Sequence, residues 1–309
     1  MNTRLLFPLM IILACNSYSA ETSNPSASEN PKREKPKSFS ELKDVVFVTQ
    51  KSSPRTLFVG VKDDVSYVFW TNATEDDLRA NSATLPDDIG MTKGTLVGRR
   101  FVPLGSPECL KQMCCSILLD ENLKTFAKQL AIIFRSFVTD MNKENAKGGP
   151  QKYFIPDMAN VFIQIDSEQK KYFFTVVPQS TATKTSIERE NFLATWAPEV
   201  YEGGPYTEAS VVYAYGVILA SVISRTLPIR KDDPLKQMQY IVDFGQQKDL
   251  MNGVIRVVGQ GHGPIIGLLT QCLNRPNVRP TFDTILKVVN DANAQDFRCS
   301  LKPLPRQGF

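Results

Sequence analysis

The stretch VVYAYGVILASVI, residues 211–223, decides how the rest of the chain must fold. It is almost continuously apolar, and no charged residue occurs between Glu208 and Arg225. That interval is short of the roughly 20 apolar residues that a helix needs to span a bilayer. A helix that is apolar on all sides belongs at the centre of a soluble core. We therefore predict a buried helix here, in preference to a transmembrane segment.

Two motifs flank this helix. WAPEV at 196–200 precedes it, and CLNRPNVRPTF at 272–282 follows it. Together with TEASVVYAYGVIL at 207–219, these segments resemble the C-terminal lobe of protein kinases in order and in separation, most closely the receptor-tyrosine-kinase and tyrosine-kinase-like groups. In that family an Ala-Pro-Glu closes the activation segment. The resemblance implies a two-lobed α+β fold with a mostly helical C-lobe and a reduced or distorted β-rich N-lobe.

The resemblance also implies an ion pair between Glu199 of the first motif and Arg279 of the last one. In the family this pair ties the activation segment to the last helices. Removing one partner of an internal bidentate pair leaves the other charge buried and alone. We predict a structural role for both residues.

The residues that would transfer phosphate match the family poorly. An amphipathic helix is expected over residues 123–141, and the segment 153–163 then falls on the catalytic loop. Asp157 and Asn160 are the candidate remnants of the Asp that orients the nucleophile and the Asn that holds a metal. They are three residues apart where the family has five. Ile155-Pro156 replaces the His-Arg that precedes the Asp.

The carboxylate that anchors magnesium in the family is missing from its place. A hairpin pattern covers residues 160–165 and 172–177, and an Asp-Phe-Gly should follow it. The chain instead reads FTVVPQ at 174–179, and Val211 stands where the family has the Asp that holds the catalytic loop. The resemblance thus implies a pseudokinase, with ATP and magnesium doubtful as cofactors and no metal site.

The N-terminal part allows two registers. Residues 45–49, 57–61 and 66–70 are rich in β-branched and aromatic residues, although the first could also end a helix. The register that we favour takes residues 56–80 as two strands, hinge and first helix, with a regulatory helix over 38–50. The other takes VGVK, ending at Lys62, as the strand that carries the ATP-binding lysine. No GxGxxG precedes Lys62, so a plain surface lysine is expected.

A glycine-rich stretch near the C-terminus superficially suggests a different site. Residues 254–258 followed by GQGHGP at 259–264 look like the strand, loop and helix of a dinucleotide site. The third glycine is out of register because position 264 is Pro, which is common at a helix start. We predict an ordinary loop before a helix.

Composition excludes several classes of function. The 36 Lys and Arg nearly balance the 32 Asp and Glu, so the dense basic stripe of an obligate nucleic-acid binder is absent. The single histidine, His262, removes most histidine-based catalysis. Without Cys15 of the N-terminal segment, five cysteines remain, and an odd number makes a poor disulfide framework.

The N-terminus has the features of a secretion signal. Arg4 precedes an apolar run at 5–14, and small residues at 17–20 offer a cleavage site. A buried N-terminal element and acylation of Cys15 are alternatives. Residues 21–37 are polar and proline-rich, so a disordered linker is expected. Asn72 in Asn-Ala-Thr is a glycosylation acceptor if the chain enters a eukaryotic secretory route.

These observations divide the chain into a signal peptide (1–20), the linker, a kinase-like domain (38–293) and a C-terminal tail (294–309). Within the domain we expect an N-lobe at about 38–80, an insertion or long loop at about 81–120 and a C-lobe at about 121–293.

The leading hypothesis for function is a binding module for a protein partner, such as another kinase domain, with no transmembrane span after the signal segment. It would act in the secretory pathway or outside the cell, or be tethered to a membrane if the N-terminal segment stays uncleaved. The alternative is an atypical active kinase that transfers phosphate from ATP to protein Ser, Thr or Tyr. Such an enzyme would use Asp157 and Asn160 with a substitute metal ligand such as Asp166.

Overall fold

The structure is a computed structural model that describes residues 34–48, 56–105, 120–148, 152–153, 156, 158–166, 171–177, 182–183, 195–228, 233–258 and 263–297. Residues 1–35 form one unit, and the compact unit considered below is Pro36–Phe309. The predictions for the signal peptide, for Asp157 and for His262 lie outside the described residues, as do those for most of the linker and of the tail. So do all cysteines except Cys272, whose burial raises the pKa of its thiol to about 12.

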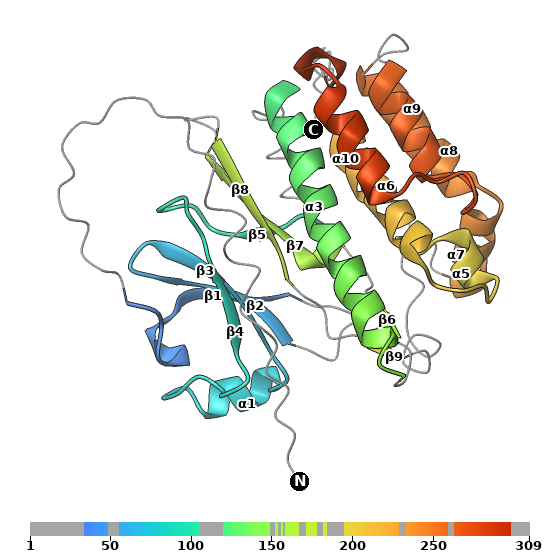
Figure 1. Ribbon diagram of the computed structural model, residues 1–309. Helices are drawn as coiled ribbons and strands as arrows, with labels where there is room; N and C mark the ends of the chain where they lie inside the picture. Colours follow the sequence, from blue (N-terminus) through green and yellow to red (C-terminus); the bar gives the residue numbers. More distant parts are fainter. Residues whose placement is uncertain are drawn as a thin grey trace. The chain divides into compact units, whose positions relative to one another are not determined.

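The first part of this unit is an antiparallel sheet with the strand order β1-β2-β3-β4 (Figure 1). Its strands are β1 (Lys43–Val48), β2 (Thr56–Lys62), β3 (Val65–Thr71) and β4 (Gly90–Lys93). The 3-10 helix η2 (Phe39–Glu41) precedes β1, and α1 (Glu75–Ala80) lies between β3 and β4 in the chain. Asp63 and Asp64 form the β2–β3 turn with φ values of 50° and 60°, a left-handed conformation that Asp tolerates better than most residues.

The favoured register of the N-terminal part is right about the two strands and the helix within 56–80 but wrong about the regulatory helix over 38–50, which does not form in the described part of that range. Residues 43–48 are a strand, and only a short 3-10 helix precedes them. Val45 and Phe47 pack on what we call the aromatic cluster, whereas Val46 is exposed. The buried members of this cluster are Phe39, Leu42, Phe58, Val65, Tyr67, Phe69 and Leu78. This alternation has the period of two that is typical of a strand.

Part of the range expected to be an insertion or long loop contributes strands. β4 pairs with β3, and β5 (Val102–Pro103) pairs with a strand near residue 162. Gly90 makes the first pairing possible, since a Cβ at this position would lie 2.0 Å from the Trp70 ring. The GMTK sequence of β4 has little strand propensity of its own, so its pairing depends on this contact with β3.

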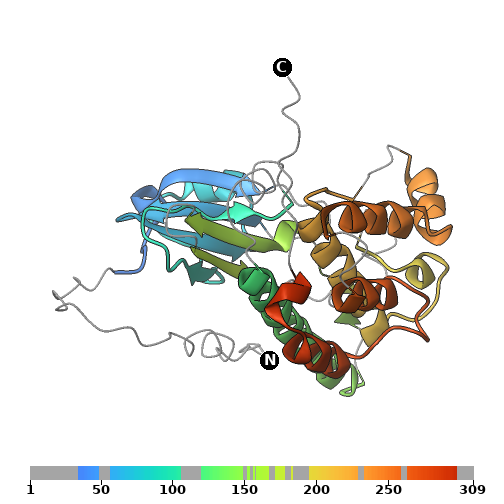
Figure 2. The same ribbon diagram turned by 90° about the horizontal axis from the view of Figure 1, so that it is seen from above.

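The second part of the unit is mostly helical. Its helices are α3 (Asp120–Asn145), α5 (Pro198–Tyr201), α6 (Glu208–Ser224), α7 (Pro234–Val242), α8 (Gly245–Val258), α9 (Gly263–Cys272), α10 (Phe282–Asp291) and the 3-10 helix η4 (Ala294–Phe297). α6 contacts α3, α8 and α9, and every residue from 210 to 224 is buried. α10, in red, lies along α3, in green, in both views (Figures 1 and 2).

The predicted central helix is therefore confirmed. Its apolar residues on all sides meet other helices of the same unit. Among the residues that the structure describes, no helix combines the length and the apolar character needed to cross a membrane. The fold is α+β.

Short strands lie between α3 and α5 in the chain. A sheet of order β5-β7-β8 contains β7 (Val161–Asp166) and β8 (Lys171–Val176), which form the predicted hairpin. β6 (Lys152–Tyr153) pairs with β9 (Ala182–Thr183), and the 3-10 helix η3 (Met158–Asn160) leads into β7. Residues 254–258 are the end of α8 and do not form a strand. The stretch that suggested a dinucleotide site therefore lacks the strand that such a site requires before its glycine-rich loop.

Candidate functional site

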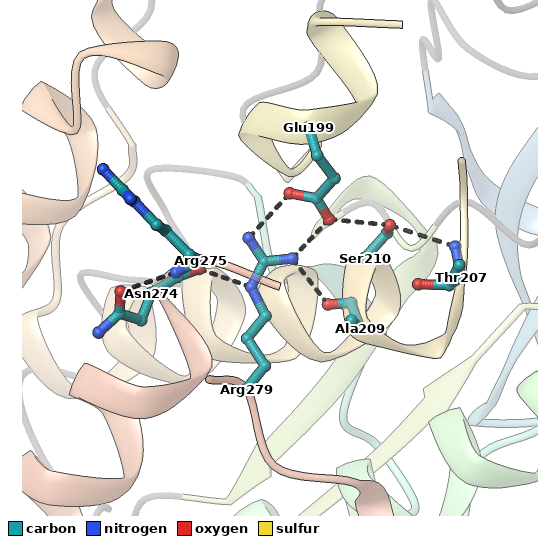
Figure 3. A network of polar contacts seen from close by, with 7 residues as sticks. All are labelled: Glu199, Thr207, Ala209, Ser210, Asn274, Arg275 and Arg279. Atoms are coloured by element: carbon teal, nitrogen blue, oxygen red, sulfur yellow. Dashed lines mark hydrogen bonds and ion pairs between the residues drawn. The ribbon is translucent and has the colours of Figure 1, made fainter. Parts of the chain in front are cut away.

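The best-defined polar network of the described residues surrounds Arg279 (Figure 3). Its two terminal nitrogens donate to the two carboxylate oxygens of Glu199 at 2.6 and 2.9 Å. Nε donates to the carbonyl oxygen of Asn274 at 2.7 Å, and one terminal nitrogen also donates to that of Ala209 at 3.0 Å. The Arg279 side chain is fully buried, and that of Glu199 is 14% exposed.

This network joins three segments that are far apart in the sequence. Glu199 lies in α5, and its carboxylate accepts a hydrogen bond from the Ser210 hydroxyl of α6 at 3.0 Å. The Arg279 guanidinium, from the segment before α10, stacks on the Tyr213 ring at 5.0 Å. Burial raises the pKa of Tyr213, so its hydroxyl stays protonated. Because the donors of Arg279 point to protein acceptors, the network is suited to holding the helices together rather than to binding a ligand.

Lys62 is more buried than the exposed lysine that the sequence predicts. Its ammonium lies 2.7 Å from the Glu41 carboxylate, and its side chain is only 17% exposed. Glu41 also accepts the backbone N–H of Lys37 at 3.2 Å. The hydrogen bond from Lys62, followed by that from Lys37, lowers the pKa of Glu41. The lysine therefore anchors the segment before β1.

Lys62 also lies on the opposite face of the sheet from Val59. Phe58 belongs to the aromatic cluster on one face, whereas Leu57 and Val59 belong to an apolar cluster on the other. Successive strand residues alternate in direction, so Gly60 and Lys62 share the face of Phe58. A Cβ at Gly60 would lie 3.1 Å from Leu42, which is consistent with that assignment.

The residue after β8, where the resemblance expects the magnesium-binding carboxylate, is buried Val177. It belongs to what we call the interior apolar cluster. The buried members of this cluster are Leu57, Val59, Val68, Phe101, Phe162 and Val177. A metal ion placed there would meet hydrocarbon instead of the oxygen ligands that magnesium requires.

Two of the remaining candidate ligands lie in the described part of the chain: Asn160 lies beside Val177, and Asp166 is paired with an arginine. Asn160 is 2% exposed, and its backbone carbonyl accepts the N–H of Val177 at 2.9 Å. Asp166 ends β7, where its carboxylate accepts a hydrogen bond from Arg99 at 3.2 Å and its side chain is 10% exposed. Within the described ranges, no three side chains of His, Cys, Asp or Glu are grouped to hold a metal ion.

Sequence reasoning missed a buried glutamine that positions the segment 94–101. Gln164 of β7 is fully buried, and its amide donates to the carbonyl oxygens of Leu96 and Arg99 at 3.3 and 2.6 Å. Its side-chain oxygen accepts the N–H of Leu96 at 3.2 Å. Gly94 makes room, since a Cβ there would lie 2.3 Å from the amide. The available signal was one polar residue within the apolar strand VFIQID.

We predict that Gln164→Leu lowers the free energy of unfolding by about 2–3 kcal/mol, because it removes three hydrogen bonds to part-buried backbone groups of Leu96 and Arg99. Urea denaturation followed by circular dichroism measures the effect. Gln271→Leu, at an exposed position of α9, is the matched control and should change stability by less than about 0.5 kcal/mol. Equal effects of the two substitutions would contradict a clamping role for Gln164.

The chain was also compared with known proteins. No protein-family model matches it. Over 109 residues it is 32% identical to mitogen-activated protein kinase kinase kinase 7 of Homo sapiens and of Bos taurus, which covers 34% of this chain and 17% and 18% of those proteins, respectively. Over 100 residues it is 34% identical to the probable serine/threonine-protein kinase roco8 of Dictyostelium discoideum, covering 31% of this chain and 5% of that protein.

The chain thus spans less than a fifth of the length of these relatives. A third relative, the probable serine/threonine-protein kinase drkC of Dictyostelium discoideum, is 32% identical over 95 residues. All three kinds of partial relative are protein kinases by name, two of them serine/threonine kinases, and the fold is α+β. A protein-kinase-like domain in this chain is supported.

Proposed function

We propose that this chain is a catalytically impaired protein-kinase-like domain that acts by binding a protein partner. The burial of Val177 in the interior apolar cluster is the observation that carries the proposal. Kinase chemistry relies on metal ions that bridge the phosphates and neutralise developing charge. A position surrounded by hydrocarbon, with Asp166 bonded to Arg99, offers little to hold such an ion.

The face of the sheet on which the Lys62 side chain lies supports the same proposal. Its ion pair with Glu41 resembles in type the lysine–glutamate pair of active kinases. However, Glu41 precedes the sheet, and Lys62 faces away from the interior apolar cluster. A nucleotide beside Val177 would therefore not meet this lysine.

The partner that we propose is a protein, such as another kinase domain. A fold whose catalytic positions are replaced is still useful if its surface is what binds. From the segments WAPEV and CLNRPNVRPTF we propose that the domain is most similar to the receptor-tyrosine-kinase and tyrosine-kinase-like groups. We also propose that residues 1–20 direct export, so that the protein acts in the secretory pathway or outside the cell.

Thermal unfolding of residues 21–309 with ATP, with and without magnesium, tests the absence of catalysis. We expect no shift of the midpoint at millimolar nucleotide. A ligand present at 100 times its Kd would add about 2.7 kcal/mol of stability, which such an experiment detects easily. A magnesium-dependent shift, with phosphate incorporation that Asp157→Asn abolishes, would establish the active-kinase alternative instead.

A further inference from the structure

We propose that Asn72 carries an N-linked glycan that is attached before the surrounding turn folds. This inference goes beyond the proposed function but rests on the proposed export. Asn72-Ala73-Thr74 is the one Asn-x-Ser/Thr triplet in the 309 residues whose middle residue is not Pro; Asn24-Pro25-Ser26 is excluded by its proline.

The folded protein has room for a glycan at this position. Asn72 lies in the turn between β3 and α1, and its side chain is exposed. The side-chain amide of Asn72 makes no hydrogen bond to any residue that the structure describes, so modifying it breaks no contact there. A bulky hydrophilic group attached to this amide extends into solvent.

The same turn engages the exposed hydroxyl that the transferase must recognise. The Thr74 hydroxyl donates to the Asp77 carboxylate at 2.7 Å and accepts the backbone N–H of Asp77 at 3.1 Å, which closes a capping box. The backbone N–H of Asn72 donates to the Asp88 carboxylate at 2.7 Å. A hydroxyl has one hydrogen to donate, and here Asp77 takes it. Because the acceptor motif requires a hydroxyl at its third position, the closed turn is a poor substrate, and modification must come first.

The chemical step requires an oligosaccharide linked through a diphosphate to a lipid, the glycosyl donor of the secretory lumen. The Asn72 amide nitrogen forms a bond to the anomeric carbon of the first sugar. The bond from that carbon to the diphosphate oxygen breaks, the lipid diphosphate leaves with the electron pair, and the amide nitrogen loses one proton. No oxidant or reductant is needed.

A glycan at Asn72 also restricts where a protein partner docks. The next residue, Ala73, lines a pocket of about 350 Å³ together with Leu78 and Leu85. A glycan at the rim of this pocket keeps large partners away from α1.

The experiment expresses the full chain in eukaryotic secretory cells and treats the product with peptide-N-glycosidase. We expect a single-glycan mobility shift for the wild type and for Thr74→Ser, and conversion of Asn72 to Asp in the released peptide by mass spectrometry. Asn72→Gln and Thr74→Asp should show neither. Thr74→Asp retains a good N-cap residue, so its failure reports the lost acceptor motif rather than a lost cap.

A second version of the chain, with residues 1–20 exchanged for an established cleavable signal, separates the site from the export. A glycan found only with the exchanged signal supports the site and overturns the export proposal. A chain that is secreted with either signal but carries an unmodified Asn72 overturns the inference. For the timing, folded unmodified protein is offered the transferase and the lipid-linked donor beside a peptide of residues 68–78. We expect modification of the peptide alone, and equal modification of both would refute attachment before folding.

Discussion

Arg279→Met is expected to lower the free energy of unfolding by about 3–5 kcal/mol, the range for removing one partner of a buried ion pair. The Glu199 carboxylate would remain mostly buried, with the Ser210 hydroxyl as its remaining donor in the network. The carbonyl groups of Asn274 and Ala209 would each lose a donor as well. In a domain of this size the loss corresponds to a drop of roughly 10 °C in Tm, which calorimetry measures directly.

An exposed ion pair of the same chain provides the control. Arg135 lies 2.9 Å from Asp283, but these side chains are 54% and 73% exposed. Arg135→Met should therefore cost less than about 1 kcal/mol. If Arg279→Met cost no more than this control, the structural role that we assign to the buried pair would be wrong.

A double-mutant cycle tests whether the cost of Arg279→Met comes from the lone charge. Glu199→Gln removes the charge but retains a side chain of similar shape. We expect the double variant to be more stable than the sum of the two single effects predicts, because it contains no unpaired buried charge. A coupling energy of about 1–3 kcal/mol is in the usual range for residues in direct contact. Strictly additive effects would show that the two residues act independently.

The helical part of the fold was predictable because its sequence signals are local. Residues 211–223 have no polar face, so a helix formed by them must be buried on all sides in the core. The structure surrounds them with α3, α8 and α9. The predicted hairpin of β7 and β8 likewise follows from two short apolar runs with a charged turn between them.

The N-terminal sheet was less predictable because its contacts are long-range. β4 forms only where the Trp70 ring covers Gly90, and the sequence GMTK does not indicate that contact. The direction of Lys62 follows from the pairing of β2, with Phe58 on one face and Val59 on the other. The alternation of residues along one strand does not reveal which face of the sheet will pack against β7.

Of the candidate site, the sequence indicated the residue types but not their surroundings. The absence of a carboxylate at position 177 was visible in FTVVPQ. The burial of Val177 against Phe101 and Phe162 was not, because these residues are 76 and 15 positions away (177 − 101 and 177 − 162). Gln164 was missed for the same reason, since its partners lie in the segment 94–101.

Relative to Val177→Asn, Val177→Asp is expected to destabilise the protein by about 4 kcal/mol at pH 7 rather than to create a magnesium site. The new carboxyl group would be surrounded by the interior apolar cluster, where burial raises the pKa of a carboxyl by roughly three units at about 1.36 kcal/mol each. Val177→Asn is the matched control, because it introduces a polar group of the same shape that does not ionise.

The pH dependence distinguishes the two variants. The unfolded chain of V177D releases the new proton near pH 3.9, roughly the value of a free Asp, whereas the folded chain retains it to a higher pH. The folded state thus binds more protons between these two values, so the stability of V177D relative to V177N falls as the pH rises through this window. Below the unfolded pKa the difference should vanish, and above the folded pKa it should be constant. Denaturation of both variants by urea between pH 3 and pH 8 measures it.

The same variant also distinguishes between the two functional hypotheses, the binding module and the active kinase. If the position after β8 still faced a nucleotide site, V177D would supply the missing ligand, and ATP with magnesium would raise its midpoint of thermal unfolding. If the interior apolar cluster fills that space, as its buried residues indicate, V177D gains no stability from ATP and magnesium at any pH at which it folds. We expect the second result, because Lys62 lies on the far face of the sheet and one new carboxylate does not supply the contacts to phosphate that the fold lacks.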